Sequence, residues 1–160
     1  MESSLMRTLA AMPASELARL AEANVVATFR IGFDTDGRCV LWKIRFKNGR
    51  DALFVLAPAA ASHFTKAVRR QARKRRWSDD GAAVSTIDLT QQDWNTTQTP
   101  ATSYRLETFD DAVVVALPAE LEPFQAMRLS PVLAVRLADL HWDEIQKGVL
   151  RDGGAVPLRS

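Results

Sequence analysis

Apolar residues along the first half of the chain change from helical spacing to strict alternation near residue 25. Before that point they lie three or four residues apart, and Pro13 is placed where a second helical segment would begin. In VVATFRIGF (25–33) and CVLWKIRFK (39–47) apolar and polar residues alternate, which predicts two strands. Asn48-Gly49 predicts a type I′ hairpin turn, in which both central residues need a positive φ. We therefore expect an N-terminal helix and a three-stranded antiparallel meander over residues 25–57.

The alternation also assigns the strand side chains to two faces. The residues expected to face the core are Val25, Ala27, Phe29, Ile31 and Phe33, followed by Val40, Trp42, Ile44 and Phe46. The residues expected on the opposite face are Val26, Thr28 and Arg30, followed by Lys43, Arg45 and Lys47. One face of the predicted sheet is therefore apolar and the other basic.

Two similar stretches suggest that the second half of the chain repeats the first. DALFVLAPAAASHF (51–64) and DAVVVALPAELEPF (111–124) lie 60 residues apart and are identical at six of fourteen positions. Each contains a predicted strand that ends at a proline, Pro58 or Pro118, and leads into a helical pattern. Two tandem βββα units would explain the match. The alternative is that any junction of strand, proline and helix selects similar residues.

The predicted fold class is α+β. The remaining elements are a helix over about 59–75, strands over 83–89, 103–109 and 112–117, and helices from about 120 to 146 interrupted at Ser130-Pro131. The polar segment 90–102 is expected to be a mobile loop, and residues 151–160 a disordered tail. We expect one domain over 1–150, with halves at about 23–77 and 83–147. An antiparallel sheet or half-closed barrel would be covered by helices.

Composition places the chain among ordinary globular proteins. Of 160 residues, 47% are apolar and 25% charged, which is enough to build a packed core. No apolar run is long enough to cross a bilayer, and the N-terminus lacks the pattern of a signal peptide. The single cysteine, Cys39, excludes an internal disulfide. We expect a cytoplasmic protein with no membrane association.

The sequence offers no set of residues for catalysis. His63 and His141 are its only histidines, and neither belongs to a metal-binding spacing. The motifs GxGxxG, GxxxxGK[ST] and GxSxG are absent, and the pairs Asp79-Asp80 and Asp110-Asp111 are typical of turns. We expect no enzyme activity, no catalytic residue, no cofactor and no metal site.

Positive charge is concentrated in one predicted helix. No acidic residue lies between Asp51 and Asp79, and seven cations occur there: Lys66, Arg69, Arg70, Arg73, Lys74, Arg75 and Arg76. The rest of the chain has 14 basic and 19 acidic residues, so the net charge of +2 depends on this helix. In a helical projection all but Arg75 lie opposite the apolar side. Phosphates, an acidic protein surface or the protein's own carboxylates could offset their mutual repulsion.

A non-catalytic role in nucleic-acid binding is the function that this charge pattern favours. The residues predicted to contact nucleic acid are Lys66, Arg69, Arg70, Arg73, Lys74 and Arg76 on the helix, and Arg30, Lys43, Arg45 and Arg105 on the sheet. Trp94, and also Trp77, lie in polar or basic surroundings where an indole could stack on a base. The alternative is that these cations only keep the surface hydrated and prevent strand edges from pairing with other chains.

The C-terminal helix suggests a second kind of function. Leu133, Leu137 and Leu140 form one apolar stripe, and a second stripe contains Val135, Ala138, Trp142 and Ile145. A helix that is apolar on two sides needs two partners. One would be the sheet; the other would be the N-terminal helix or a second copy of the protein. A homodimer contact through Val135, Trp142 and Ile145 is therefore the alternative, in a protein-interaction module that could bind an acidic partner.

The order of elements over residues 25–147 resembles two groups of proteins. Tandem units of antiparallel strands followed by a helix are similar to those of Whirly and purine-rich-element-binding proteins, although those proteins have four strands per unit. That resemblance implies binding of single-stranded nucleic acid across a sheet. The same order also resembles type III secretion chaperones, which are dimers that hold an unfolded stretch of a secreted partner. Those chaperones are generally acidic, whereas this chain carries a basic helix.

Overall fold

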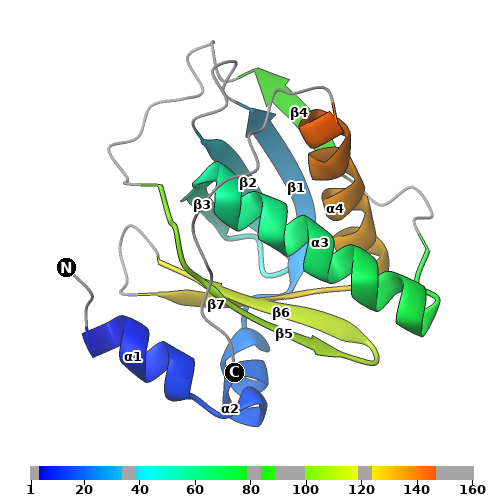
Figure 1. Ribbon diagram of the computed structural model, residues 1–160. Helices are drawn as coiled ribbons and strands as arrows, with labels where there is room; N and C mark the ends of the chain where they lie inside the picture. Colours follow the sequence, from blue (N-terminus) through cyan, green and yellow to red (C-terminus); the bar gives the residue numbers. More distant parts are fainter. Residues whose placement is uncertain (1–3, 34–38, 79–83, 89–99, 119–123, 147–160) are drawn as a thin grey trace.

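The computed structural model describes residues 4–33, 39–78, 84–88, 100–118 and 124–146 (Figure 1). Its elements, in chain order, are α1 (Ser4–Ala11), α2 (Ala14–Ala21), β1 (Val26–Phe33), β2 (Val40–Phe46), β3 (Asp51–Leu56), α3 (Pro58–Arg75), β4 (Val84–Asp88), β5 (Arg105–Phe109), β6 (Ala112–Leu117), β7 (Gln125–Leu129) and α4 (Pro131–Gln146). The α+β class is confirmed. Within the described ranges, every helix is too short or too polar to span a membrane.

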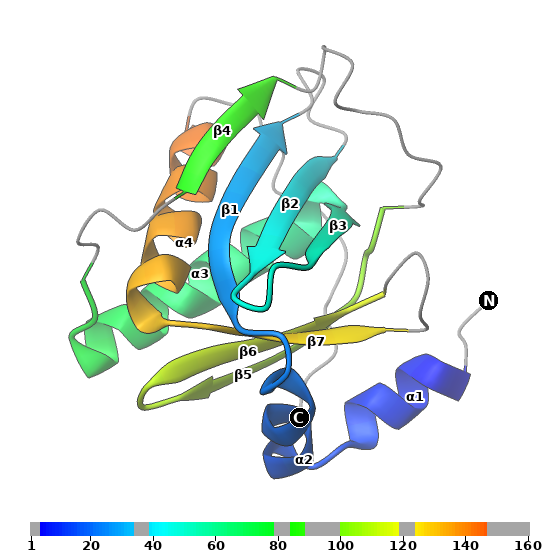
Figure 2. The same cartoon turned by 180° about the vertical axis from the view of Figure 1, so that it is seen from behind.

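Four strands form the first sheet, in the order β3-β2-β1-β4. β1, β2 and β3 are the expected antiparallel meander, whereas β4 lies parallel to β1 at one edge. This parallel edge departs from the predicted antiparallel sheet, because the chain passes through α3 before β4 returns beside β1. Residues from α3 and α4 join the core on one face of this sheet. No described helix lies over the other face (Figure 2).

The second sheet has the order β5-β6-β7 and is covered on both faces. β6 is buried at all six positions, as expected for a continuously apolar strand. Val113 and Val115 face the first sheet, whereas Val114 and Ala116 pack with residues of α1 and α2. Within the described ranges, a bridge between Val25 and Arg128 joins the two sheets, and the strands do not close into a barrel.

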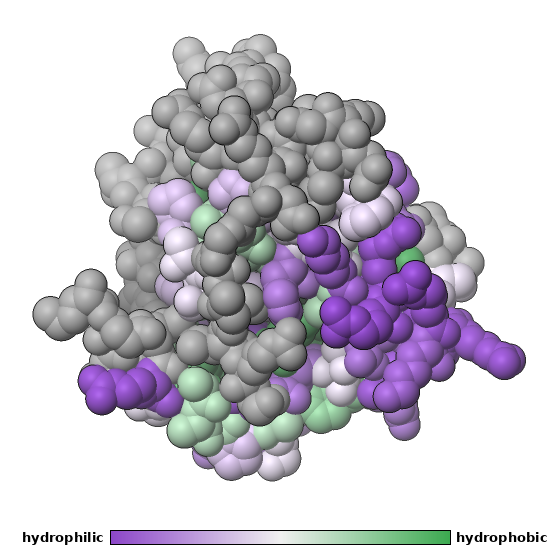
Figure 3. Space-filling view, in the orientation of Figure 1, coloured by the Kyte–Doolittle hydropathy of each residue, from purple (hydrophilic) through white to green (hydrophobic). Residues whose placement is uncertain are grey.

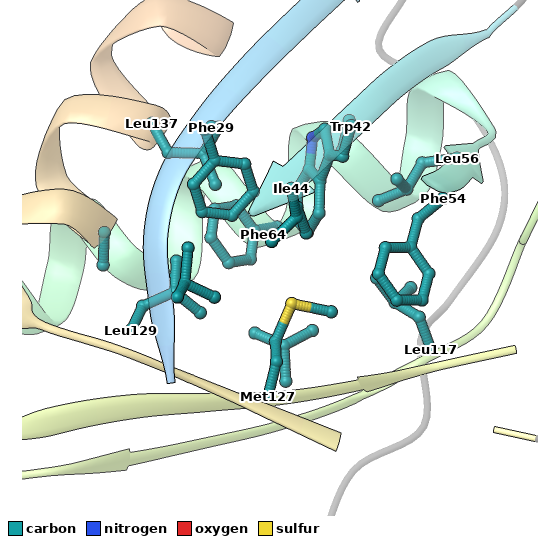
Figure 4. Close-up of a cluster of buried hydrophobic side chains, with 14 of the residues drawn as sticks. Phe29, Trp42, Ile44, Phe54, Leu56, Phe64, Leu117, Met127, Leu129 and Leu137 are labelled. Atoms are coloured by element: carbon teal, nitrogen blue, oxygen red, sulfur yellow. The ribbon is translucent and has the colours of Figure 1, made fainter. Parts of the chain in front are cut away.

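The main core lies between the two sheets and the helices α3 and α4 (Figure 4). The Trp42 and Phe64 rings meet edge to face with centroids 5.2 Å apart, and Phe29 meets Trp42 in the same way at 5.5 Å. Met127 and Leu129 reach this cluster from the second sheet. The alternation of β2 and the helical spacing of α3 are therefore confirmed, because both direct their large apolar residues into one core.

One core residue of β1 was assigned to the wrong face. The register of β1 against β2 shifts between Val26 and Thr28, which marks a bulge or irregularity in the pairing. Val26 is only 3% exposed and packs in the main core with Phe29 and Ile31, although strict alternation placed it on the opposite face. The shift breaks the period of two at this position, and sequence alternation alone cannot show it.

The hairpin between β2 and β3 is confirmed, but its predicted turn type is wrong. Gly49 has a φ of 87°, and no other residue of this turn has a positive φ. The Gly49 N–H donates to the Phe46 carbonyl, and the Phe46 N–H donates to the Arg50 carbonyl. This is the pattern of a type I turn followed by a glycine bulge, which needs one positive φ rather than two. The Asn48 Oδ1 also accepts a hydrogen bond from the Arg50 N–H.

A strand, β7, replaces the first part of the helix predicted over 120–146. Met127 and Leu129 face the main core, and Ala126 faces the cluster formed with α1 and α2. This alternation has a period of two, and it lets the short segment complete the second sheet. The helix predicted after Ser130-Pro131 is confirmed as α4. The expectation for the start of that span, at 119–123, lies outside the described residues.

The 60-residue match does not align equivalent elements of the fold. Pro58 follows the third strand of the meander and begins α3, whereas Pro118 follows the middle strand of the second sheet. Phe64 is fully buried in the main core, whereas Phe124 is partly buried against the cluster with α1 and α2. Two tandem βββα units would place both prolines before a helix and both phenylalanines at matching buried positions, and neither correspondence holds. The tail at 151–160 and most of the predicted loop at 90–102 lie outside the described residues.

Candidate nucleic-acid interface

The basic segment of the sequence lies along the side of α3 that faces away from the core. Phe64 and Val68 on its other side are fully buried. Hydrophilic side chains gather over α3 on the face shown in Figure 3. The exposed cations of this segment are Lys66, Arg70, Arg73, Lys74 and Arg76. The helical projection of the sequence is therefore correct for these five residues.

Arg69 is held between α3 and α4. Its Nη1 atom lies 3.0 Å from Oδ1 of Asp139 on α4, and each side chain is 38% exposed. Its guanidinium carbon lies 4.6 Å from the centroid of the Trp142 ring, within the range of a cation–π contact. Arg69 therefore links the two helices and fixes Trp142 beside the exposed cations of α3.

Two adjoining hollows form a shallow groove between α3 and α4, which we call the α3–α4 groove. The first, of about 200 Å³, is lined by Lys66, Arg69, Arg70, Arg73 and Trp142. The second, of about 170 Å³, is lined by Val68, Arg69, Ala72, Arg73, Val135 and Asp139. The hollows share two arginines. The groove thus combines four cations, one aromatic ring and an apolar floor.

One cation near the end of α3, Arg75, is paired with other residues of the chain. Arg75 donates to Gln71 over 3.0 Å and forms an ion pair with Asp110 in the turn between β5 and β6. Arg76 adopts a left-handed conformation, with a φ of 59°, at a helix end where glycine is usual. Cations in a last helical turn are also favoured by the helix dipole. Lys74 and Arg76 do not line the groove.

The basic residues of the first sheet lie on the opposite side of that sheet from α3. Arg30 and Lys43 are cross-strand neighbours on this outer face, which Figure 2 shows from the front. Arg45 donates to both carboxylate oxygens of Asp51, over 2.8 and 3.1 Å. This hydrogen-bonded pair lowers the pKa of Asp51 and raises the pKa of Arg45. The structure therefore does not bring the basic helix and the basic sheet face together.

Arg105 was predicted to contact nucleic acid, but its side chain is completely buried. Its Nη1 donates to the carbonyls of Leu9 and Met12, over 2.8 and 2.7 Å, at the end of α1. Its Nε lies 2.9 Å from Oε2 of Glu107. The prediction is wrong because α1 and α2 cover the face of the second sheet that was expected to be solvated. Arg105 instead holds the C-terminus of α1 on this sheet.

The aromatic residue beside the cations was not one of those predicted. Trp94 lies outside the described residues. Trp77 follows the end of α3 and is partly buried against the main core. The centroid of its ring lies 5.8 Å from the guanidinium carbon of Arg75. Trp142 on α4 was assigned to a dimer contact, yet it lines the groove. A sequence cannot show which residues face each other across two helices that are far apart in the chain. The only signal for Trp142 was its position three residues after Asp139 on α4.

The second apolar side of α4 packs against α3 of the same chain. Val135 is 8% exposed and lies at the floor of the groove with Val68 and Ala72. The Ile145 side chain lies outside the described part of the structure. The expected second partner, the N-terminal helix or another copy, is therefore replaced by α3. Val135, one of the three residues predicted to form a dimer contact, therefore packs within the chain, whereas the dimer itself stays a prediction.

Both histidines have partners within the fold. His141 is fully buried, and its Nε2 accepts a hydrogen bond of 3.0 Å from the Trp42 indole. Burial lowers its pKa to about 3, and a weaker opposing effect comes from a backbone hydrogen bond with Leu137. His63 Nδ1 lies 3.0 Å from the Tyr104 hydroxyl. Among the described residues, no three His, Cys, Asp or Glu side chains are placed to hold a metal ion.

The chemistry of the α3–α4 groove is that of a surface for aromatic anions. Lys66, Arg70 and Arg73 can donate to phosphate oxygens, and the Trp142 ring offers an apolar face beside them. Asp139 adds a carboxylate acceptor at the neighbouring hollow.

The chain was compared with known proteins. No family model, curated protein or solved structure matches it.

Proposed function

We propose that this protein binds single-stranded nucleic acid without catalysing a reaction on it, and that the α3–α4 groove is the contact surface. Lys66, Arg70 and Arg73 bind successive phosphates, and a base stacks on Trp142. The observation that carries this proposal is the position of Trp142, whose ring lies in the same hollow as four cations of α3. A purely solvated basic helix would need no aromatic ring among its charges.

The electrostatics of the groove favour an anionic ligand. Arg70 and Arg73 form no ion pair with any residue that the structure describes, and they lie three positions apart on one helical face. Like charges at this spacing repel one another, and the released counterions of a bound strand supply much of the affinity for phosphates. Arg69 is already engaged by Asp139, so it positions Trp142 rather than serving as a free phosphate ligand.

The aromatic ring favours a single strand over a duplex. A base can lie flat on Trp142 only if it is unstacked from its neighbours, and bases within a duplex are not available for that contact. The ring is half-buried and held by Arg69 and its own helix, so little order is lost when a base stacks. Any base offers a flat face, so little sequence preference is expected.

Replacing Trp142 with leucine should weaken binding to a single-stranded oligonucleotide by roughly 5- to 150-fold, because one stacked base contributes about 1–3 kcal/mol. The measurement is a fluorescence-anisotropy titration with a labelled oligothymidylate at low salt. Trp77→Leu is the matched control, because Trp77 lies outside the groove and should leave affinity unchanged. Thermal unfolding of both variants checks that they are folded. Equal affinity for parent and Trp142→Leu would contradict the stacking role, and absence of binding by the parent would contradict the proposed function.

A further inference from the structure

The outer face of the first sheet carries a hollow of its own. It measures about 380 Å³ and is lined by Thr28, Arg30, Lys43, Ile44, Arg45, Asp51 and Ala52. Arg30 and Arg45 are exposed and Lys43 is half-buried. The hollow lies on neighbouring strands β1, β2 and β3, where regular secondary structure fixes the positions of its side chains. We call it the sheet hollow.

The charge of the sheet hollow is positive on balance. Arg30 lies directly opposite Lys43 in the pairing of β1 and β2, and like charges in that arrangement are destabilising. Asp51 accepts both hydrogen bonds from Arg45 and also attracts Lys43. Three cations and one carboxylate leave a net charge of +2 around the hollow. A bound phosphate would reduce the repulsion between Arg30 and Lys43.

The sheet hollow differs from the α3–α4 groove because none of the described residues that line it is aromatic. Its polar groups are guanidinium, ammonium and hydroxyl donors, together with the Asp51 carboxylate. These donors suit phosphate oxygens, but they give no flat surface on which a base could stack. The ligand that fits is a phosphodiester backbone, bound without regard to the bases.

We propose that the sheet hollow is a second phosphate-backbone site, so that one protein molecule holds two segments of nucleic acid at once. The two surfaces are separated by the first sheet and the core beneath α3, in which Phe29 and Trp42 are buried. A strand bound in the α3–α4 groove would have to pass around the edge of the first sheet to reach the sheet hollow. This inference rests on the proposed function of the groove.

Native mass spectrometry with an oligothymidylate of about eight nucleotides tests this inference by counting oligonucleotides on each protein chain. The parent should bind two oligonucleotides per chain. Arg30→Gln/Lys43→Gln should bind one, and the affinity of its α3–α4 groove for the oligonucleotide should be that of the parent. The matched control is Arg7→Gln/Arg19→Gln, which removes two exposed charges on α1 and α2 and should still bind two.

Each possible count has a distinct meaning. A parent that binds one oligonucleotide per chain would overturn the second site while the proposed function stands. Two oligonucleotides on Arg30→Gln/Lys43→Gln would overturn it as well, because the second strand would then lie elsewhere. No binding by the parent would overturn the proposed function itself. A bridging assay, in which protein on one immobilised strand captures a second labelled strand, should be positive for the parent and negative for Arg30→Gln/Lys43→Gln.

Discussion

Replacing Arg105 with methionine should lower the free energy of unfolding by about 3–5 kcal/mol, although this residue lies on a strand far from the groove. The substitution leaves the carbonyls of Leu9 and Met12 without their donor and leaves the Glu107 carboxylate without its cation. The Glu107 side chain is only 15% exposed, so water compensates little. Urea unfolding followed by circular dichroism measures the loss.

A double variant separates the ion pair from the packing of Arg105. Arg105→Met/Glu107→Leu should be more stable than Arg105→Met alone, because it removes a largely buried carboxylate that has lost the Arg105 guanidinium. Limited proteolysis should cut both variants within α1 sooner than the parent, because Arg105 connects α1 to the second sheet. A loss below about 1 kcal/mol for Arg105→Met would show that α1 is held by its apolar contacts alone.

Acidification should destabilise the protein through His141. Its pKa is lowered to about 3 in the folded chain, from an ordinary value of 6.5, because burial penalises the charged ring. Between these values the unfolded state binds a proton that the folded state does not. The stability that the neutral His141 contributes is therefore fully present above pH 6.5 and is lost as the pH falls toward 3. The contribution of this residue should fall by about 2 kcal/mol between pH 7 and pH 5.

Chemical unfolding at a series of pH values tests this linkage. His141→Gln should flatten the pH dependence in this range, because glutamine does not titrate and its side-chain carbonyl can still accept from the Trp42 indole. His63→Gln is the control, because His63 is half-buried and lies near Tyr104 instead. Identical pH profiles for the parent and His141→Gln would refute the assignment of the acid sensitivity to His141.

The fold was most predictable where local pattern and tertiary packing agree. β2 alternates from Trp42 to Phe46, and α3 begins at Pro58 and presents its apolar side to the core, so both were predicted from periodicity. β7 was missed because the seven residues between Pro123 and Pro131 fit a short strand as well as a helix. Only the open edge of β6, to which β7 pairs, decides between them.

The candidate site was predictable in its charges but not in its geometry. The helical projection identified Lys66, Arg70 and Arg73 as exposed, because it depends on α3 alone. Burial of Arg105 depends on α1, which packs there from 93 to 96 residues away in sequence. Trp142 meets α3 only through the packing of α3 against α4. Contacts of this kind depend on the whole fold, and no local spacing encodes them.

The salt dependence of oligonucleotide binding tests the central claim most directly. The logarithm of the affinity for a single-stranded oligonucleotide should fall linearly with the logarithm of the salt concentration, with about 0.7 units of slope for each phosphate contact. Lys66→Gln/Arg70→Gln/Arg73→Gln should bind more weakly and flatten the slope by about two units, whereas Arg7→Gln/Arg19→Gln/Arg50→Gln, which removes three exposed charges elsewhere, should keep the parent slope. An affinity that does not change with salt, or equal slopes for the parent and the groove variant, would contradict nucleic-acid binding through the α3–α4 groove.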